Sequence, residues 1–194
     1  MDLLPPKALV VVSHPSWTRS IANKGCVAAI QERWPCEIHL LQNDAPNWDI
    51  QHEQRLLSQT DLWIFQFPLF WYGVPGRMKS WLDDVFSWGW AFDANGGLLR
   101  GKHMVCSVTV GSDLTSYAPG KRNKHGLETY LSPLEQFANY TGIEWHGIIP
   151  TQARDWKDEP ASEETKDRFQ RELEVVFNQL PPHSVEPSTD KIVT

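Results

Sequence analysis

The sequence predicts an α/β fold in which one parallel five-stranded sheet lies between two layers of helices. Strand-like and helix-like segments alternate along the chain, which is typical of parallel strands joined by crossover helices. The first strand-like segment, Ala8 to Val12, is apolar at every position, as expected of a central strand covered on both faces. The 194 residues are 41% hydrophobic and 22% charged, an ordinary composition for one domain with a sizeable core. We expect a single domain over residues 1–194, with its core at about 7–180.

Three strands and three helices are expected in the first half of the chain. Apolar runs predict the strands at 8–12, 36–41 and 62–67. Helical spacing predicts a helix over about 20–33, with one apolar face made of Ala22, Cys26, Ala29 and Ile30. A short helix is expected at about 50–58. A third helix begins at Pro75, since proline is favoured at the first helical position, and buries Met78, Trp81, Leu82 and Val85.

Two strands and two helices are expected in the second half. The strands are predicted at 103–109 and about 143–149. Between them, Ser132-Pro133-Leu134-Glu135 matches a capping box, which indicates a helix start, and that helix ends near Gly142. A last helix from about Ser162 stacks the apolar residues Phe169, Leu173, Val176, Phe177 and Leu180. The remaining residues, 181–194, are expected to form a polar tail.

This succession of elements predicts a flavodoxin-like three-layer sandwich with strand order 2-1-3-4-5. Ligands of such sheets bind beyond the carboxyl ends of the strands, near the point where the strand order reverses. The loops after the first, third and fourth strands meet there, so ligand-binding residues are expected in those loops.

Composition excludes several classes of protein. The net charge is −6, which does not favour binding to nucleic acid. Neither a signal peptide nor an apolar run of about 20 residues is present, and three cysteines without CxxC spacing favour thiols in a reducing cytoplasm. The sequence has no HExxH zinc motif, Walker A loop or nucleophile elbow, and no metal site is expected.

The loop after the first strand, SHPSWTRS, is suited to holding a phosphate. It offers several hydroxyls, the imidazole of His14 and the cation of Arg19, and a helix follows at once. The free N–H groups and the positive dipole end of that helix would point into the loop. The alternative is an ordinary N-cap with solvated neighbours.

Aromatic residues are concentrated after the third strand. Phe70, Trp71 and Tyr72 are consecutive and precede Gly73, and they would suit either a flat heteroaromatic ligand or an aromatic plug of the core. Of the ten tryptophans, Trp88 and Trp90 flank a glycine beyond a helix end, where a monomer would leave much of their surface wet. These residues predict a pocket lining or an interface between subunits.

Tyr117 and His125 follow the fourth strand and the segment Thr109-Val110-Gly111-Ser112. A phenol and an imidazole could handle protons beside a reacting ring, although each alone is more often a surface or core residue.

The chain closely resembles one family in three segments, SHPSWTRSIAN, QFPLFWYGVPGRMKSWLDDVFSWGWAF and GKHMVCSVTVG. This is the flavodoxin-like NAD(P)H dehydrogenase (quinone) family. It includes DT-diaphorase, the modulators of drug activity and the ancillary flavoproteins of glutathione-regulated potassium-efflux systems. The resemblance covers roughly residues 7–180. It implies non-covalent binding of FMN, or alternatively FAD, and two-electron transfer from NAD(P)H through the flavin to a quinone by a cytoplasmic homodimer.

The resemblance also assigns roles to individual residues. Flavin phosphate would be held by His14, Arg19, Ser20 and Asn23. The isoalloxazine would lie against Pro68, Leu69, Phe70, Trp71 and Tyr72, with Thr109 and Gly111 on its pyrimidine side. Tyr117 and His125 would be the catalytic pair near the flavin O2, and Trp88, Trp90 and Phe92 would form the substrate pocket and dimer contact.

The chain departs from the family pattern at Ser112, where a second glycine is usual, and in the APGKRNK segment that separates Tyr117 from His125. Two alternatives to a quinone reductase remain open. One is a flavin-bound regulatory subunit of a potassium-efflux antiporter, at the inner face of the membrane. The other is a one-electron carrier, which the enclosing Trp88–Phe92 segment disfavours.

Overall fold

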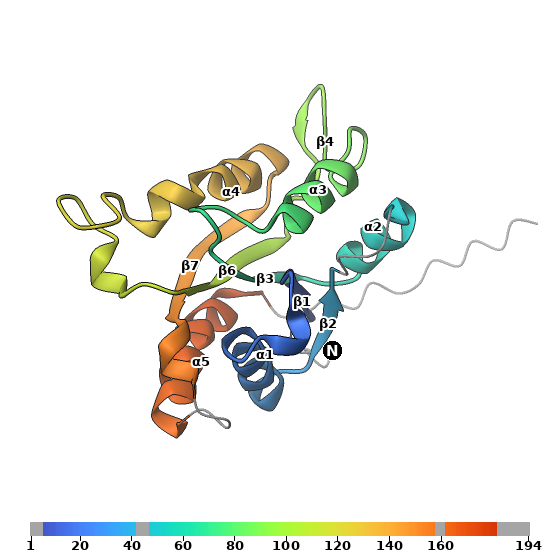
Figure 1. The fold of residues 1–194 in the computed structure, drawn as a ribbon. Helices are drawn as coiled ribbons and strands as arrows, with labels where there is room; N and C mark the ends of the chain where they lie inside the picture. The colour runs from blue at the N-terminus through green and yellow to red at the C-terminus, as the bar shows by residue number, and fades with distance from the viewer. Residues whose placement is uncertain (1–5, 42–46, 158–161, 182–194) are drawn as a thin grey trace, which may run out of the picture.

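The computed structural model describes residues 6–41, 47–157 and 162–181, and there it has the predicted three-layer architecture (Figure 1). The central sheet is parallel, with strand order β2-β1-β3-β6-β7. These strands are β1 (Ala8–Val12), β2 (Cys36–Leu40), β3 (Leu62–Pro68), β6 (His103–Val110) and β7 (Glu144–Gln152). They are the five predicted strands, so the order 2-1-3-4-5 is confirmed. The predicted polar tail, apart from Pro181, lies outside the described residues.

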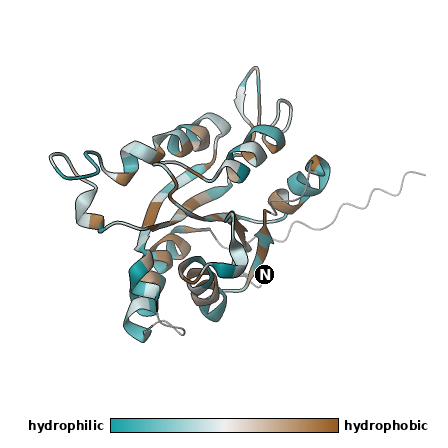
Figure 2. Ribbon diagram, viewed as in Figure 1, coloured by the Kyte–Doolittle hydropathy of each residue, from teal (hydrophilic) through white to brown (hydrophobic). Residues whose placement is uncertain are grey.

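Helices cover both faces of the sheet. One layer holds α1 (Ala22–Arg33) and α5 (Glu163–Gln179), and the other holds α2 (Ile50–Ser58), α3 (Gly76–Val85) and α4 (Leu127–Thr141). The five predicted helices are therefore present. Figure 2 shows mostly hydrophobic colours along the strands and hydrophilic colours on the outer faces of the helices. None of the helices in the described parts of the chain is long and apolar enough to cross a membrane.

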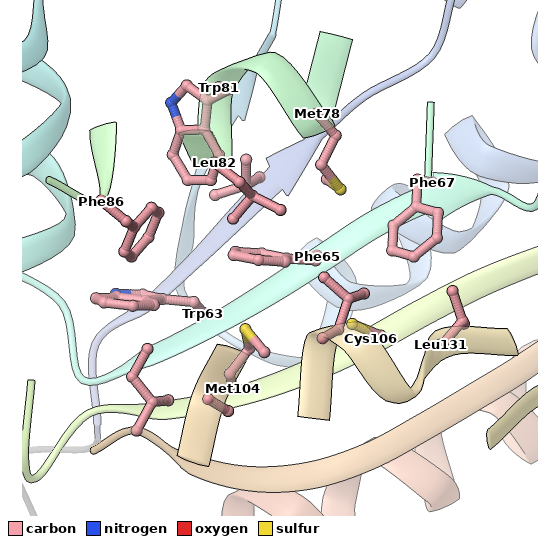
Figure 3. Close-up of a cluster of buried hydrophobic side chains, with 14 of the residues drawn as sticks. Trp63, Phe65, Phe67, Met78, Trp81, Leu82, Phe86, Met104, Cys106 and Leu131 are labelled. Atoms are coloured by element: carbon pink, nitrogen blue, oxygen red, sulfur yellow. The ribbon is translucent and has the colours of Figure 1, made fainter. Parts of the chain in front are cut away.

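The core beneath α2, α3 and α4 is rich in aromatic rings. Trp63, Phe65 and Phe67 alternate along β3 and project toward α3, where Trp81 and Phe86 meet them (Figure 3). The Trp81 ring lies edge-on to Phe65 and to Phe86, at centroid distances of 5.8 and 5.4 Å. These five aromatic rings pack closely in one layer and restrain β3. The end of β3, where the next loop begins, is therefore well positioned.

The start of α4 differs from the prediction. The helix begins at Leu127, with Gly126 as its N-cap, and Ser132-Pro133 lies inside it, so the predicted capping box is wrong. A proline inside a helix lacks the N–H that would bond the carbonyl four residues earlier, here Thr129. The Ser132 hydroxyl donates to that carbonyl at 3.0 Å instead, which explains why the helix continues through Pro133.

Smaller differences concern α1 and a short hairpin. The helix α1 begins at Ala22 rather than Ser20, after a 3₁₀ turn at Trp17–Arg19. The antiparallel pair β4 (Phe92–Asp93) and β5 (Gly96–Gly97) was not predicted, because two-residue strands leave no periodic pattern. Gly97 lies so close to the end of α4 that a Cβ there would be 2.2 Å from the Thr141 carbonyl carbon.

Candidate functional site

A cavity of about 650 Å³ opens at the carboxyl edge of the sheet, where loops after β1, β3, β6 and β7 converge. Nine of the eleven predicted cofactor-binding residues line it: His14, Arg19, Ser20, Asn23, Pro68, Leu69, Phe70, Thr109 and Gly111. The remaining two, Trp71 and Tyr72, follow Phe70 in the same turn. Loops predicted from the sequence to meet therefore do enclose one cavity.

The N-terminus of α1 lies in the wall of this cavity and has no side-chain cap. Ile21 occupies the N-cap position and offers no hydrogen-bond acceptor to the helix. Ala22 and Asn23, the first helical residues, line the cavity, and their N–H groups have no acceptor inside the helix. Uncapped N–H groups together with the positive end of the helix dipole attract an anion.

Two cations add to this positive field. Arg19 lies in the 3₁₀ turn before α1 and bonds the Ser16 hydroxyl at 3.3 Å. Lys157 reaches the cavity from the segment after β7, beside Ala153. Lys157 was not predicted, because β7 extends to Gln152 rather than ending near 149, and binding residues were expected only in the loops after the first, third and fourth strands. The predicted strand order could have indicated this loop, because all strands of a parallel sheet end at the same edge.

The imidazole of His14 is held in one orientation. Its Nδ1 accepts the Ser16 backbone N–H at 3.0 Å, which leaves the proton of the neutral ring on Nε2. Burial lowers the pKa of His14 below its ordinary value, although the bond from Ser16 opposes that shift. The ring is therefore neutral at pH 7 and acts as a hydrogen-bond donor.

A buried hydrogen-bond network ties three of the loops together beneath the cavity. The amide of Asn23 donates to the Ser20 hydroxyl at 3.2 Å and to the Thr109 hydroxyl at 3.1 Å. Its Oδ1 accepts from the Gln66 amide at 2.8 Å. Asn23 thus links α1, β3 and β6, and it supports the cavity wall in addition to lining it.

The aromatic turn after β3 is a strained two-residue hairpin. The Phe70 and Gly73 backbones exchange hydrogen bonds of 3.1 and 3.0 Å, and the two residues between them have positive φ, 46° at Trp71 and 64° at Tyr72. Asn and Gly favour such a primed turn, whereas two aromatic side chains there cost roughly 1–3 kcal/mol each. The amide N–H groups of Trp71 and Tyr72 take no part in the turn's two hydrogen bonds.

Side chains of this turn leave apolar surface uncovered. The Trp71 side chain is 95% exposed, and Phe70 lies edge-on to His14 across the cavity mouth, with ring centroids 6.3 Å apart. A Cβ at Gly111, which also lines the cavity, would meet nothing within 4 Å. The cavity therefore has an aromatic edge and room for a flat ring.

Tyr117 and His125 lie beside the cavity, not in its lining. Both pack edge-on against Tyr130 of α4, at centroid distances of 6.5 and 5.8 Å, and Tyr72 stacks on the same ring at 4.6 Å. Tyr130 was not predicted as a site residue, because no sequence motif distinguishes it from other residues of its helix. Burial raises the pKa of Tyr117, opposed by a hydrogen bond with Ser112. The serine that departs from the family pattern thus contacts the predicted catalytic tyrosine.

The three aromatic residues predicted at the substrate pocket and dimer contact have different surroundings. Trp88 is 64% exposed, as expected, and lies edge-on to Phe92. Trp90 is instead half-buried against Phe86, with ring centroids 5.4 Å apart, which corrects the expectation that a monomer leaves it wet. Phe92 lines a second, apolar groove of about 460 Å³ between α3 and α4.

The cavity residues suit the phosphate and ring of a flavin. An uncapped helix end with Arg19 and Lys157 matches an anionic group, and the Phe70 ring with the open space at Gly111 matches a planar ring with a polar edge.

Comparisons with known proteins agree with this fold and site. The family described as having a flavodoxin-like fold matches residues 6–174. The potassium-efflux ancillary protein KefG of Yersinia pestis is 35% identical over 147 residues, which are 75% of this chain and 80% of KefG. The structure of an NADPH-quinone reductase from P. pentosaceus is 28% identical, with a TM-score of 0.74, and the match covers 85% of this chain and 96% of that one.

The structure of general stress protein 14 from Treponema denticola, in complex with FMN, is 25% identical and has a TM-score of 0.77. That match covers 91% of this chain and the whole of the other. The protein described here therefore belongs to the flavodoxin-like family that its three sequence segments resemble.

Proposed function

We propose that the protein is a flavin-dependent NAD(P)H oxidoreductase that binds FMN in the 650 Å³ cavity and reduces a quinone. The uncapped N-terminus of α1, placed in the cavity wall beside Arg19, carries this proposal. The FMN complex of the similar general stress protein 14 and the similarity to an NADPH-quinone reductase support it. FMN is preferred to FAD on that basis.

A bound flavin supplies two-electron redox chemistry that no amino-acid side chain provides. The net reaction converts NAD(P)H, a proton and a quinone into NAD(P)⁺ and a hydroquinone. The α1 N–H groups, Arg19 and Lys157 would hold the phosphate, and the amides of Trp71 and Tyr72, which take no part in the turn's two hydrogen bonds, would be available as donors to the ring. A phenol is protonated at neutral pH and burial raises the pKa of Tyr117 further, so Tyr117 would serve as a hydrogen-bond donor to negative charge on the reduced ring. His125 remains the proposed second proton-handling group.

We further propose that two copies associate through the groove between α3 and α4. Exposed aromatic rings border this groove, including Trp88 and Tyr140, and Phe92 packs on Tyr140 at 5.2 Å. Patches of this kind on a monomer mark interfaces. A cytoplasmic location fits the buried thiols Cys26 and Cys106, which stay reduced in that compartment.

The experiment that tests the flavin site is titration of the purified protein with FMN. Replacing Arg19 and Ser20 together by alanine should weaken FMN affinity by about 2–4 kcal/mol, the sum of one charged and one neutral hydrogen bond. Arg171→Ala, an exposed arginine of α5, is the matched control and should leave affinity unchanged. Protein that binds no FMN, or a double variant with undiminished affinity, would contradict the proposed site.

The KefG relative favours a second candidate, a flavin-bound subunit that regulates a potassium-efflux antiporter. The two candidates share the cavity and differ in turnover. Rapid reduction of benzoquinone by NAD(P)H favours the enzyme. Slow turnover, together with potassium efflux through a co-reconstituted antiporter that depends on this protein, favours the regulatory subunit.

A further inference from the structure

A cluster of metal-ligating side chains lies at the edge of the sheet opposite the cavity. It consists of His103, the first residue of β6, and Glu144 and His146 at the start of β7. From His103 to Gly111, eight residues of strand at about 3.3 Å each place this cluster about 25 Å from the cavity wall. The proposed flavin chemistry uses none of these residues.

Strand pairing brings the three side chains to one face. His103 pairs with Glu144 in the parallel ladder, so both side chains point the same way, and His146 follows two residues later on that face. A register irregularity after Met104, with Gly147 at φ +85°, then reverses the alternation. In a regular strand, residues three apart point to opposite faces. Because of the irregularity, His146 and Ile149 both lie on the face of the sheet that α5 covers.

The donor atoms already have the spacing that a tetrahedral ion requires. His103 Nδ1 lies 2.9 Å from His146 Nε2 and 3.6 Å from Glu144 Oε2, and all three donor atoms are within 4.8 Å of one another. Bonds of about 2.0–2.1 Å to Zn²⁺ in tetrahedral geometry set neighbouring ligand atoms about 3.3 Å apart. The measured spacings lie on either side of that value.

A residue outside the cluster fixes the orientation of His146. Its Nδ1 is 3.1 Å from Oε1 of Gln179, the last residue of α5. An amide oxygen only accepts, so His146 donates from Nδ1 and keeps the lone pair of Nε2 for the cluster. Metal-binding histidines are oriented in this way by a second hydrogen bond.

From this geometry we propose a Zn²⁺ site formed by His103 Nδ1, His146 Nε2 and the Glu144 carboxylate. Two imidazoles and one carboxylate are the donors that Zn²⁺ accepts, and the 68% exposed side chain of Glu144 leaves the fourth position open to water. A bound Zn²⁺ would link the start of β7 to the start of β6. Through the hydrogen bond between His146 and Gln179, it would also link the end of α5 to the sheet.

The test is Zn²⁺ titration of tag-free full-length protein with a competing chromophoric chelator. One Zn²⁺ per chain is expected. His146→Gln and Glu144→Gln should each abolish that binding, and Gln179→Leu should weaken it about 10-fold. His52→Gln, an exposed histidine of α2, is the matched control and should bind as the unmodified chain does.

Two further measurements separate a built site from adventitious binding. Co²⁺ in place of Zn²⁺ should give the visible bands of a four-coordinate ion, absent in His146→Gln. Zn²⁺ should raise the Tm of the unmodified chain and of His52→Gln, but not that of His146→Gln. FMN affinity should not change in Glu144→Gln, so this test stands apart from that of the flavin site. No Zn²⁺ binding, or equal binding by His146→Gln, overturns the proposal and leaves a hydrogen-bonded histidine pair.

Discussion

At the scale of single residues, the buried carboxylate of Glu53 joins three elements. Its Oε2 lies 2.7 Å from His39 Nε2 on β2 and accepts the Trp81 indole N–H of α3 at 2.9 Å. Burial raises the pKa of this carboxyl, but the hydrogen bonds from His39 and Trp81 and the nearby imidazole of His52 outweigh it. The pKa of Glu53 therefore lies below its ordinary value, and the folded state favours the charged form.

We expect Glu53→Gln to lower the free energy of unfolding at pH 7 by about 1–3 kcal/mol, since a charge-assisted hydrogen bond is lost. A depressed folded pKa contributes stability that is fully present above the unfolded value, about 4.3, and is lost as pH falls through the folded value. The deficit of the variant should therefore shrink between pH 5 and pH 3. Urea unfolding across this range measures it, with the exposed Glu135→Gln as control. A deficit independent of pH would mean that packing, rather than charge, is involved.

The sequence alone indicated most of the residues around the cavity, but not how they are held. His14, Arg19 and Ser20 lie in a loop whose composition already favours a phosphate. The second role of Asn23, bonding Ser20, Thr109 and Gln66, depends on partners up to 86 positions away in the chain. Tyr130 is likewise one helical residue among others until the fold brings Tyr72, Tyr117 and His125 around it.

At the scale of elements, the β4–β5 hairpin depends on one close backbone contact. A Cβ at Gly97 would meet Thr141 and Gly142 backbone atoms at 2.2–2.4 Å, and backbone moves less easily than a side chain. Gly97→Ala should therefore destabilise the fold by about 1–3 kcal/mol through overpacking. Gly76→Ala, where nothing lies within 4 Å of the new Cβ, should be neutral or stabilising by up to about 1 kcal/mol. Thermal unfolding of both variants checks this, and similar Tm values would refute the contact.

Elements differed in how far their sequences predicted them. Buried strands such as β1 and β3 are continuous apolar runs, so their positions followed directly. The start of α4 did not, because a capping-box pattern at Ser132 coincided with a proline that the helix tolerates. The hairpin also left no signal, since it is specified by contact with α4 rather than by its own periodicity.

At the scale of the whole molecule, the prediction concerns assembly. The exposed 64% of the Trp88 side chain would lose about 100–160 Å² of surface to a partner, worth about 2–4 kcal/mol per ring as an upper bound. A two-fold interface counts this contact twice. Sedimentation should give about twice 22.3 kDa at micromolar concentration, and Trp88→Ala should raise the dimer dissociation constant.

Val175→Ala is the matched control, since Val175 is 58% exposed on α5 in the opposite layer. It should leave the dimer intact. A chain that sediments as a monomer while reducing quinone at full rate would remove the dimer from the proposed function.

The missing cap of α1 has a consequence for the life of the protein in a cell. An anion bound at Ala22 and Asn23 completes the first turn of the helix, so it stabilises the folded chain and not the unfolded one. At a free ligand concentration 100 times its Kd, this linkage adds about 2.7 kcal/mol to the free energy of unfolding. Without ligand, the unfolded fraction of the chain is larger by the corresponding factor of about 100. Proteases cleave unfolded chains, so the ligand-free protein is degraded faster. Cofactor supply would then regulate abundance, so that chains without a ligand are removed and loaded chains accumulate.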